Sequence, residues 1–259
     1  MAKKINLLPL AGLALRTLVV LLVLFAAAVG PAEAAISFVQ STGKFNTASG
    51  TSITSPAFAT NPVVGNKIIV LACGGDGGGI IFINSLNGTL VTSFTLGDLE
   101  ASPTMSYDGN TLYVGNVNGD YYAINLNTLT QKWWFPLGAG FPLKGFVWED
   151  WNTPGRLYFS TGGNMVWCIQ DNGGSASSVW TTAVTAPSTP PPMETLLYVG
   201  SSDGKVHQLR LSDGFDDPVK RYTVGDGTKQ VGDVSTETLT ELFVPTTEGK
   251  LYKLPLPLP

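Results

Sequence analysis

The stretch ASPTMSYDGNTLYVGNVNGDYYAINL, residues 101–126, decides the fold of this 259-residue chain. It holds two turn pairs, Asp108-Gly109 and Asn118-Gly119, which bound the strand-forming runs 111–115 and 120–126. An Asn-Gly or Asp-Gly pair between such runs is a strong signal for a β-hairpin. The stretch therefore predicts antiparallel strands joined by tight turns.

The same unit recurs along the chain, and its period indicates the architecture. Strands at 101–106 and 131–137 bring the quoted unit to four strands. One large apolar residue in the second strand recurs at intervals of 44, 45, 40 and 45 residues. These positions are Ile69, Tyr113, Tyr158, Tyr198 and Phe243. A period near this value with four strands per unit is typical of a β-propeller.

The repeats thus predict an all-β chain, a β-propeller of about five four-stranded blades. They span about residues 54–97, 101–138, 142–184, 187–225 and 230–254. The last repeat runs into alternating prolines, which cannot form a ladder strand, so its fourth strand is missing. We expect an N-terminal strand at about 36–41 to complete the last blade and close the ring. Alternatively, residues 36–72 belong to a different β-module and the last four repeats form an incomplete propeller.

Aromatic side chains are expected to fill the space between neighbouring blades. Each fourth strand carries one large ring, and these rings are Phe94, Trp134, Trp180 and Tyr222. Trp133 and Trp167 also fall on repeat positions. All four tryptophans are therefore predicted to be core residues.

Residues 1–34 are expected to be a secretory signal peptide. Lys3, Lys4 and Arg16 precede an apolar run at 18–29, and Ala32-Glu33-Ala34 is a small-x-small cleavage pattern. An uncleaved membrane anchor is the alternative, although the run is short for a span of about 20 residues. Residues 35–259 would then be the propeller domain, exported to the periplasm or the extracellular space, without stable membrane insertion after cleavage.

The net charge bears on the class of partner, and the cysteine content bears on whether a disulfide forms. Without residues 1–34 the chain has 12 basic and 18 acidic residues, a net charge of −6. We expect no nucleic-acid partner, because no basic stripe is present to neutralise phosphates. Cys73 and Cys168 fall in the first and third repeats, so two separate buried thiols are expected rather than the disulfide that export would permit.

The repeats resemble a known family. Residues 101–126, and the unit VGSSDGKVHQL at 199–209, are similar to the PQQ-like repeat of the quinoprotein alcohol-dehydrogenase-like superfamily, over about residues 54–254. That family includes enzymes and non-catalytic members, such as the propeller lipoprotein of the outer-membrane barrel-assembly machine. The enzymes of the family use pyrroloquinoline quinone (PQQ) and have a vicinal disulfide and a calcium site of Glu, Asn and Asp, so the resemblance would imply these features if this chain were such an enzyme. This chain has no adjacent cysteines and no matching ligand set, so neither PQQ nor calcium is expected.

The segment 145–155 is longer than the link between first and second strands in the other repeats. It holds the five candidate residues for binding a ligand or partner: Phe146, Trp148, Glu149, Asp150 and Trp151. Exposed aromatic and carboxylate side chains in a long loop are typical of recognition. The alternative is that Phe146 and Trp148 plug the central channel or cover the blade.

Acidic residues recur in the turns and links that share one face of a propeller. They include Asp76, Asp203, Asp226, Asp233 and Glu248. This face could bind a cation or a basic partner, but Asp also favours such turns for backbone reasons alone. No segment has the spacing of an EF-hand, so no metal ligands are assigned.

Catalytic signals are weak. His207, the only histidine, occupies the repeat position of Tyr122, Trp167 and Tyr252, and we expect it to replace a packing aromatic. We therefore favour an exported, non-catalytic binding or scaffolding module that contacts a protein or another envelope component. The alternatives are a small PQQ-dependent or sugar-acting propeller enzyme, and a structural module of a surface adhesin.

Overall fold

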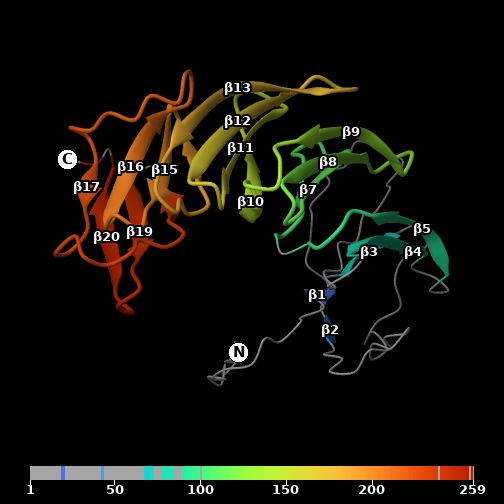
Figure 1. Ribbon diagram of the computed structural model, residues 1–259, viewed down its shortest axis with the longest axis horizontal. Helices are drawn as coiled ribbons and strands as arrows, with labels where there is room; N and C mark the ends of the chain where they lie inside the picture. Colours follow the sequence, from blue (N-terminus) through green and yellow to red (C-terminus); the bar gives the residue numbers. More distant parts are fainter. Residues whose placement is uncertain are drawn as a thin grey trace. The chain divides into compact units, whose positions relative to one another are not determined.

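The structure, a computed structural model, describes residues 19–20, 42–43, 67–72, 78–84, 89–99, 101–238, 240–256 and 258. Within these residues every regular element is a β-strand, which confirms the all-β prediction. The chain divides into two compact units, Met1–Thr95 and Leu96–Pro259 (Figure 1). Over the same described residues, no helix has the length and apolar character needed to cross a bilayer.

The first unit contains two antiparallel sheets. One pairs β1 (Val19–Val20) with β2 (Thr42–Gly43). The other has the order β3 (Lys67–Ala72), β4 (Gly79–Asn84) and β5 (Leu90–Thr95). The predicted closing strand at 36–41 and, apart from Val19–Val20, the predicted signal peptide lie outside the described residues.

The second unit contains four antiparallel sheets, each with its strands in sequence order. The first consists of β6 (Thr104–Met105), β7 (Thr111–Gly115), β8 (Asp120–Asn125) and β9 (Thr130–Pro136). The second consists of β10 (Leu143–Glu149), β11 (Arg156–Thr161), β12 (Met165–Asp171) and β13 (Ala176–Ala183). The third consists of β14 (Pro192–Met193), β15 (Leu196–Gly200), β16 (Lys205–Arg210) and β17 (Tyr222–Thr223). The last has three strands, β18 (Ser235–Thr238), β19 (Glu241–Pro245) and β20 (Leu251–Pro255).

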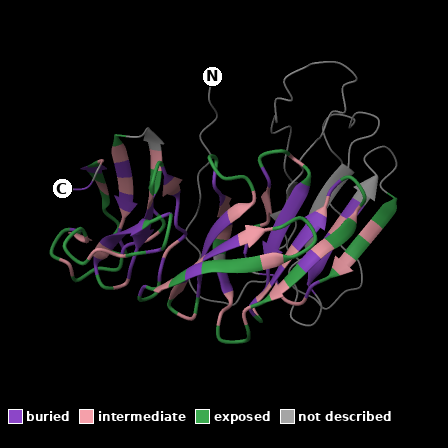
Figure 2. Ribbon diagram, turned by 90° about the horizontal axis from the view of Figure 1, so that it is seen from above, coloured by how far each residue is buried: buried purple, intermediate pink, exposed green. Residues whose placement is uncertain are grey.

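Burial follows the order of strands within each sheet. β7 is buried at every residue, and β11 and β15 at every residue but the first, whereas most of β9 and β13 is exposed or half-buried (Figure 2). The apolar runs in the second strands have neighbours on both faces, so they show no alternation. The β6–β9 and β10–β13 sheets therefore each have a buried inner part and an outer fourth strand.

Consecutive sheets of the second unit pack face to face through apolar clusters. One cluster joins Tyr113 and Trp133 of the first sheet to Leu157 and Phe159 of the second. Two further clusters join the second sheet to the third and the third to the last. A single blade would expose apolar side chains on both faces, and stacking buries them, as expected for propeller blades.

The two adjacent tryptophans of β9 lie on opposite faces, which corrects part of the core prediction. Trp133 is 4% exposed and packs in the cluster between the first two sheets, whereas Trp134 is 53% exposed. Successive side chains of a strand point to opposite faces, so only one of the pair can be buried here. Trp133 lies opposite Ala123 and Trp180 opposite Cys168. Trp133, not Trp134, is therefore the counterpart of Trp180.

Gly119, of the predicted turn pair Asn118-Gly119, and Gly249, in the turn between β19 and β20, differ in what surrounds them, which allows a paired test. Gly119 and Gly249 have φ of 81° and 80°, where a residue with a Cβ is strained by about 1–2 kcal/mol. A Cβ at Gly119 would collide with the carbonyl oxygen of Gly138, whereas a Cβ at Gly249 has nothing within 4 Å. We expect Gly119→Ala to lower the free energy of unfolding by about 1–2 kcal/mol more than Gly249→Ala. Urea denaturation of both variants measures this difference, and equal losses would contradict the described packing at Gly119.

Candidate binding pocket between two sheets

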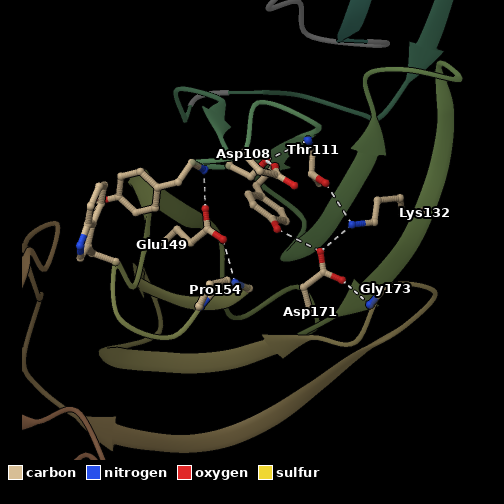
Figure 3. Close-up of a pocket in the computed structure, with 12 residues that line it drawn as sticks. Asp108, Thr111, Lys132, Glu149, Pro154, Asp171 and Gly173 are labelled. Carbon is tan, nitrogen blue, oxygen red and sulfur yellow. Dashed lines mark hydrogen bonds and ion pairs between the residues drawn. The ribbon is translucent and has the colours of Figure 1, made fainter. Parts of the chain in front are cut away.

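A cavity of about 390 Å³ lies where the β6–β9 and β10–β13 sheets meet (Figure 3). It lies beside the turn from β6 to β7, the loop from β10 to β11 and the end of β12. The lining residues are Ser106, Tyr107, Asp108, Thr111, Tyr113, Lys132, Glu149, Trp151, Pro154, Gly155, Asp171 and Gly173. Two repeats therefore contribute to one pocket.

The floor of the pocket is built around Asp171 at the end of β12. Its Oδ2 accepts hydrogen bonds from Lys132 Nζ and Tyr113 Oη, each at 3.0 Å, and its Oδ1 accepts one from Gly173 N at 2.7 Å. Lys132 also donates to Thr111 Oγ1 at 3.0 Å (Figure 3). The Asp171 side chain is 4% exposed and that of Lys132 is 20% exposed, so a partly buried ion pair with hydrogen bonds around it fixes the floor. Burial, together with the charge and hydrogen bond of Asp171, raises the pKa of Tyr113, so this hydroxyl stays a donor.

Glu149 connects the two sheets at the side of the pocket. Its Oε2 accepts a hydrogen bond from Tyr107 N and its Oε1 one from Gly155 N, both at 2.7 Å (Figure 3). Asp150 is also buried, and it accepts hydrogen bonds from Asn152 N and from Tyr158 Oη. Both carboxylates thus hold the loop from β10 to β11 in place, and their partners in these bonds are uncharged groups.

Two exposed aromatic side chains flank the opening. Trp151 is 75% exposed and Tyr107 is 56% exposed. Their rings meet edge to face, with centroids 5.1 Å apart and planes at 84°. Partial burial, with the nearby charges of Glu149 and Asp150, raises the pKa of Tyr107.

The five predicted site residues divide between the pocket and the strand before it. Glu149 and Trp151 line the pocket, and Asp150 adjoins it. The segment was expected to be a loop, but Phe146, Trp148 and Glu149 belong to β10, because that strand continues to Glu149. Phe146 and Trp148 pack on each other with centroids 5.2 Å apart, and Trp148 also contacts the next apolar cluster. Neither is among the residues that line the cavity.

The acidic residues predicted for a cation face are occupied by local contacts. Asp226 accepts hydrogen bonds from Thr228, and Asp233 accepts one from Thr189 N. Glu248 contacts Lys250 and Tyr252, and Asp203 contacts His207. Asp76 lies outside the described residues. Across the residues that the structure describes, no three His, Cys, Asp or Glu side chains are grouped to hold a metal ion, and the cation face stays a prediction.

His207 is buried opposite Val199, at the repeat position predicted from the sequence, but the contacts of its ring nitrogens are polar. Its Nδ1 lies 2.7 Å from Asp216 Oδ2 and its Nε2 lies 3.2 Å from Asp203 Oδ2. Arg221 also contacts Asp216 Oδ2, at 2.9 Å. The pairing of the Asp216 carboxylate with His207 was not predicted from the sequence. The ring needs polar partners when buried, and Asp216 and Asp203 supply them.

The described residues do not fit the quinone site of the family's enzymes. Cys168 is a free, buried thiol, and burial raises its pKa to about 12. Cys73 lies outside the described residues, and the two cysteines are 95 positions apart in the sequence, whereas a vicinal disulfide needs adjacent ones. We therefore assign no PQQ-dependent step to this protein.

Comparison with known proteins shows the family. Residues 76–252 match the family of PQQ-like repeats described as outer membrane protein assembly factor BamB. BamB from Moraxella catarrhalis has a similar structure, with a TM-score of 0.55, 15% identity and coverage of 71% of this chain. The chain spans only 60% of that protein. The C-terminal WD40 domain of Sif2 is also similar, with a TM-score of 0.54, 16% identity, and coverage of 74% of this chain and 52% of that one.

The comparison with functionally curated proteins gives no match. The two similar structures support the predicted β-propeller fold, and at such low identity they support the fold alone. The match over residues 76–252 covers more than half of the sequence and follows the predicted repeats. The chain therefore belongs to the PQQ-like repeat family described as outer membrane protein assembly factor BamB.

Proposed function

We propose that this protein is exported and acts as a non-catalytic binding or scaffolding module in the cell envelope. The observation that carries the proposal is the exposed pair of Trp151 and Tyr107 over a preformed pocket. Aromatic residues are enriched among the side chains that dominate protein interfaces. Trp151 and Tyr107 lie together at the opening, 75% and 56% exposed, so a partner bound at the pocket would cover both rings.

Three further observations support the proposal. The family description names an outer-membrane assembly factor, and the sequence begins with the features of a secretory signal peptide. The pocket itself is held by hydrogen bonds that backbone N–H groups of both sheets or their loops donate to Glu149 and Asp171. A surface that is already ordered loses less conformational entropy on binding. The partner is expected to be a protein or another envelope component.

Trp151 and Trp134 provide a matched pair for testing the surface. Both are exposed tryptophans of the second unit, but only Trp151 lines the pocket. A photo-crosslinking residue at position 151, in cells that produce the full chain, should capture a defined partner, and the same residue at 134 should not. With that partner purified, we expect Trp151→Ala to weaken binding about tenfold or more, and Trp134→Ala to leave it unchanged. Fractionation of the cells and the mass of the mature protein test export and cleavage after Ala34.

Equal capture at positions 151 and 134 would reject this surface. Recovery of the chain only from the cytoplasm would reject export. Because Trp151 is mostly exposed, its replacement should not alter the unfolding transition.

A further inference from the structure

We infer that the pocket between the β6–β9 and β10–β13 sheets receives an arginine side chain of a protein partner. This inference rests on the proposed function and deepens it, because it states the chemistry that the surface recognises. Three features of the described residues carry the inference: the charge of the lining, the aromatic side chains at the opening, and the size of the cavity.

The lining carries an excess of negative charge. Asp108, Glu149 and Asp171 line the pocket, and Lys132 is the single cation among the lining residues. Lys132 is already bonded to Asp171 and Thr111. Glu149 is bonded to backbone N–H groups, so its charge has no counter-ion in these contacts. A guest cation would neutralise part of this excess, whereas an anion would be repelled.

The excess charge is partly buried, which makes it effective. Glu149 and the adjoining Asp150 are 7% and 6% exposed, and the Asp171 side chain is 4% exposed. Solvent and salt screen buried charges less than exposed ones. Asp108 lies at the exposed side of the pocket. The hydrogen bond described for its Oδ2 is the one that the side-chain amide of Asn110 donates. A carboxylate oxygen can accept more than one hydrogen bond, so Asp108 can also bind a guanidinium donor.

The aromatic residues select arginine among cations. Trp151 and Tyr107 meet edge to face, and both remain more than half exposed. A guanidinium group stacks on exposed aromatic faces and donates to carboxylates in the same plane, which an ammonium group does less well. The structure already holds one such contact elsewhere, where the Arg210 guanidinium lies 4.6 Å from the ring centroid of Phe215.

The cavity has the size for one side chain. Its volume of about 390 Å³ lies near the lower end of the range for ligand pockets, about 300–1,000 Å³. The positions of Glu149, Asp171 and Lys132 are fixed by hydrogen bonds, so a guest meets groups that are already oriented (Figure 3). One long cationic side chain, with its peptide backbone at the opening, matches this space and this charge.

The test uses the blocked tripeptide acetyl-Gly-Arg-Gly-amide, its neutral citrulline analogue and the corresponding glutamate peptide. Binding to the purified protein is followed by NMR at the backbone amides of Tyr107, Gly155 and Gly173, which line the pocket. We expect saturable shifts with the arginine peptide, binding about fivefold weaker for citrulline, and no binding of the glutamate peptide. Trp151→Ala and Asp108→Asn should each weaken arginine binding severalfold, and Trp134→Ala should not.

Either of two results would overturn the inference. One is the absence of shifts at these amides with the arginine peptide, and the other is equal affinity for arginine and citrulline. A neutral sugar that shifts the same amides when the arginine peptide does not would show a carbohydrate pocket instead. The proposed function is tested separately from this inference. If position 151 captures a defined protein but the arginine peptide does not bind, the proposal of a binding module stands and only its preference for arginine is rejected.

Discussion

Replacing Trp133 by Ala is expected to lower the free energy of unfolding by about 3–5 kcal/mol. The Trp133 side chain is 4% exposed on β9 and packs in the cluster that joins the β6–β9 sheet to the β10–β13 sheet. Its ring lies 6.0 Å from that of Tyr113, and across the ladder it faces only the small side chain of Ala123. Truncation would leave a cavity that these neighbours cannot fill without moving the sheets. Urea denaturation followed by circular dichroism measures the loss.

Trp134 is the matched control for this substitution. It is the next residue of the same strand and is 53% exposed, with one exposed hydrogen bond from Nε1 to Asp120 Oδ1. Trp134→Ala should change stability by less than about 1 kcal/mol. Trp133→Phe should also be milder than Trp133→Ala, because it keeps a ring and removes an indole N–H that is buried without a partner among the described residues. If Trp134→Ala were the more damaging variant, the face assignment of β9 would be wrong.

Most of the fold could be predicted from the repeat pattern, because the signals for strands and turns come from residues that are close together in the sequence. The second strand of the quoted unit was predicted at residues 111–115, and β7 has those bounds. The turn pair Asn118-Gly119 separates β7 from β8 as predicted, and Gly119 adopts the positive φ that such turns need. These features depend on neighbours a few residues away, which the sequence displays directly.

The choice between Trp133 and Trp134 could not be made from the same signals. Both residues suit a strand, and the repeat spacing does not say which one faces the core. The pairing of β8 with β9 shifts register between Ala123 and Ile124. Such a bulge changes which residues lie opposite one another, so alternation counted along the sequence loses its phase.

The candidate site was only partly predictable, because two repeats build it. Trp151 and Glu149 stood out as an aromatic residue and a carboxylate in an unusually long segment. The residues that complete the pocket did not stand out in the sequence. Glu149 accepts a hydrogen bond from the backbone of Tyr107, 42 residues away, and Lys132 binds Asp171, 39 residues away. Each of these pairs joins neighbouring blades. Knowing that the pocket forms therefore requires the packing of one blade on the next, which no single repeat displays.

The buried pair of His207 and Asp216 leads to the second large effect. The side chains of His207 and Asp216 are 5% and 6% exposed, and Arg221 also contacts Asp216. Asp216→Ala would remove the partner of the His207 Nδ1 atom and of the partly buried Arg221 guanidinium, and would leave the buried ring with Asp203 alone. Removing one partner of a buried pair costs about 3–5 kcal/mol, and we expect a loss in that range. Asp213→Ala is the control, because Asp213 pairs with Arg210 in the same loop but its side chain is 50% exposed. That exposed pair should contribute little to stability, because solvent screens it.

The same carboxylate predicts how stability depends on pH. Burial alone would raise the pKa of Asp216, but the hydrogen bonds and charges of His207 and Arg221 outweigh it and hold the pKa below its ordinary value. The folded state therefore binds the proton less readily than the unfolded state. The stabilisation is complete above the pKa that the carboxyl has in the unfolded chain, about 3.9, and is lost as pH falls through the lower folded value. Urea midpoints measured from neutral pH down through this window should fall less steeply for Asp216→Ala than for the wild-type protein. Parallel curves would mean that Asp216 keeps the same affinity for its proton in both states, and that its contacts with His207 and Arg221 do not stabilise the fold.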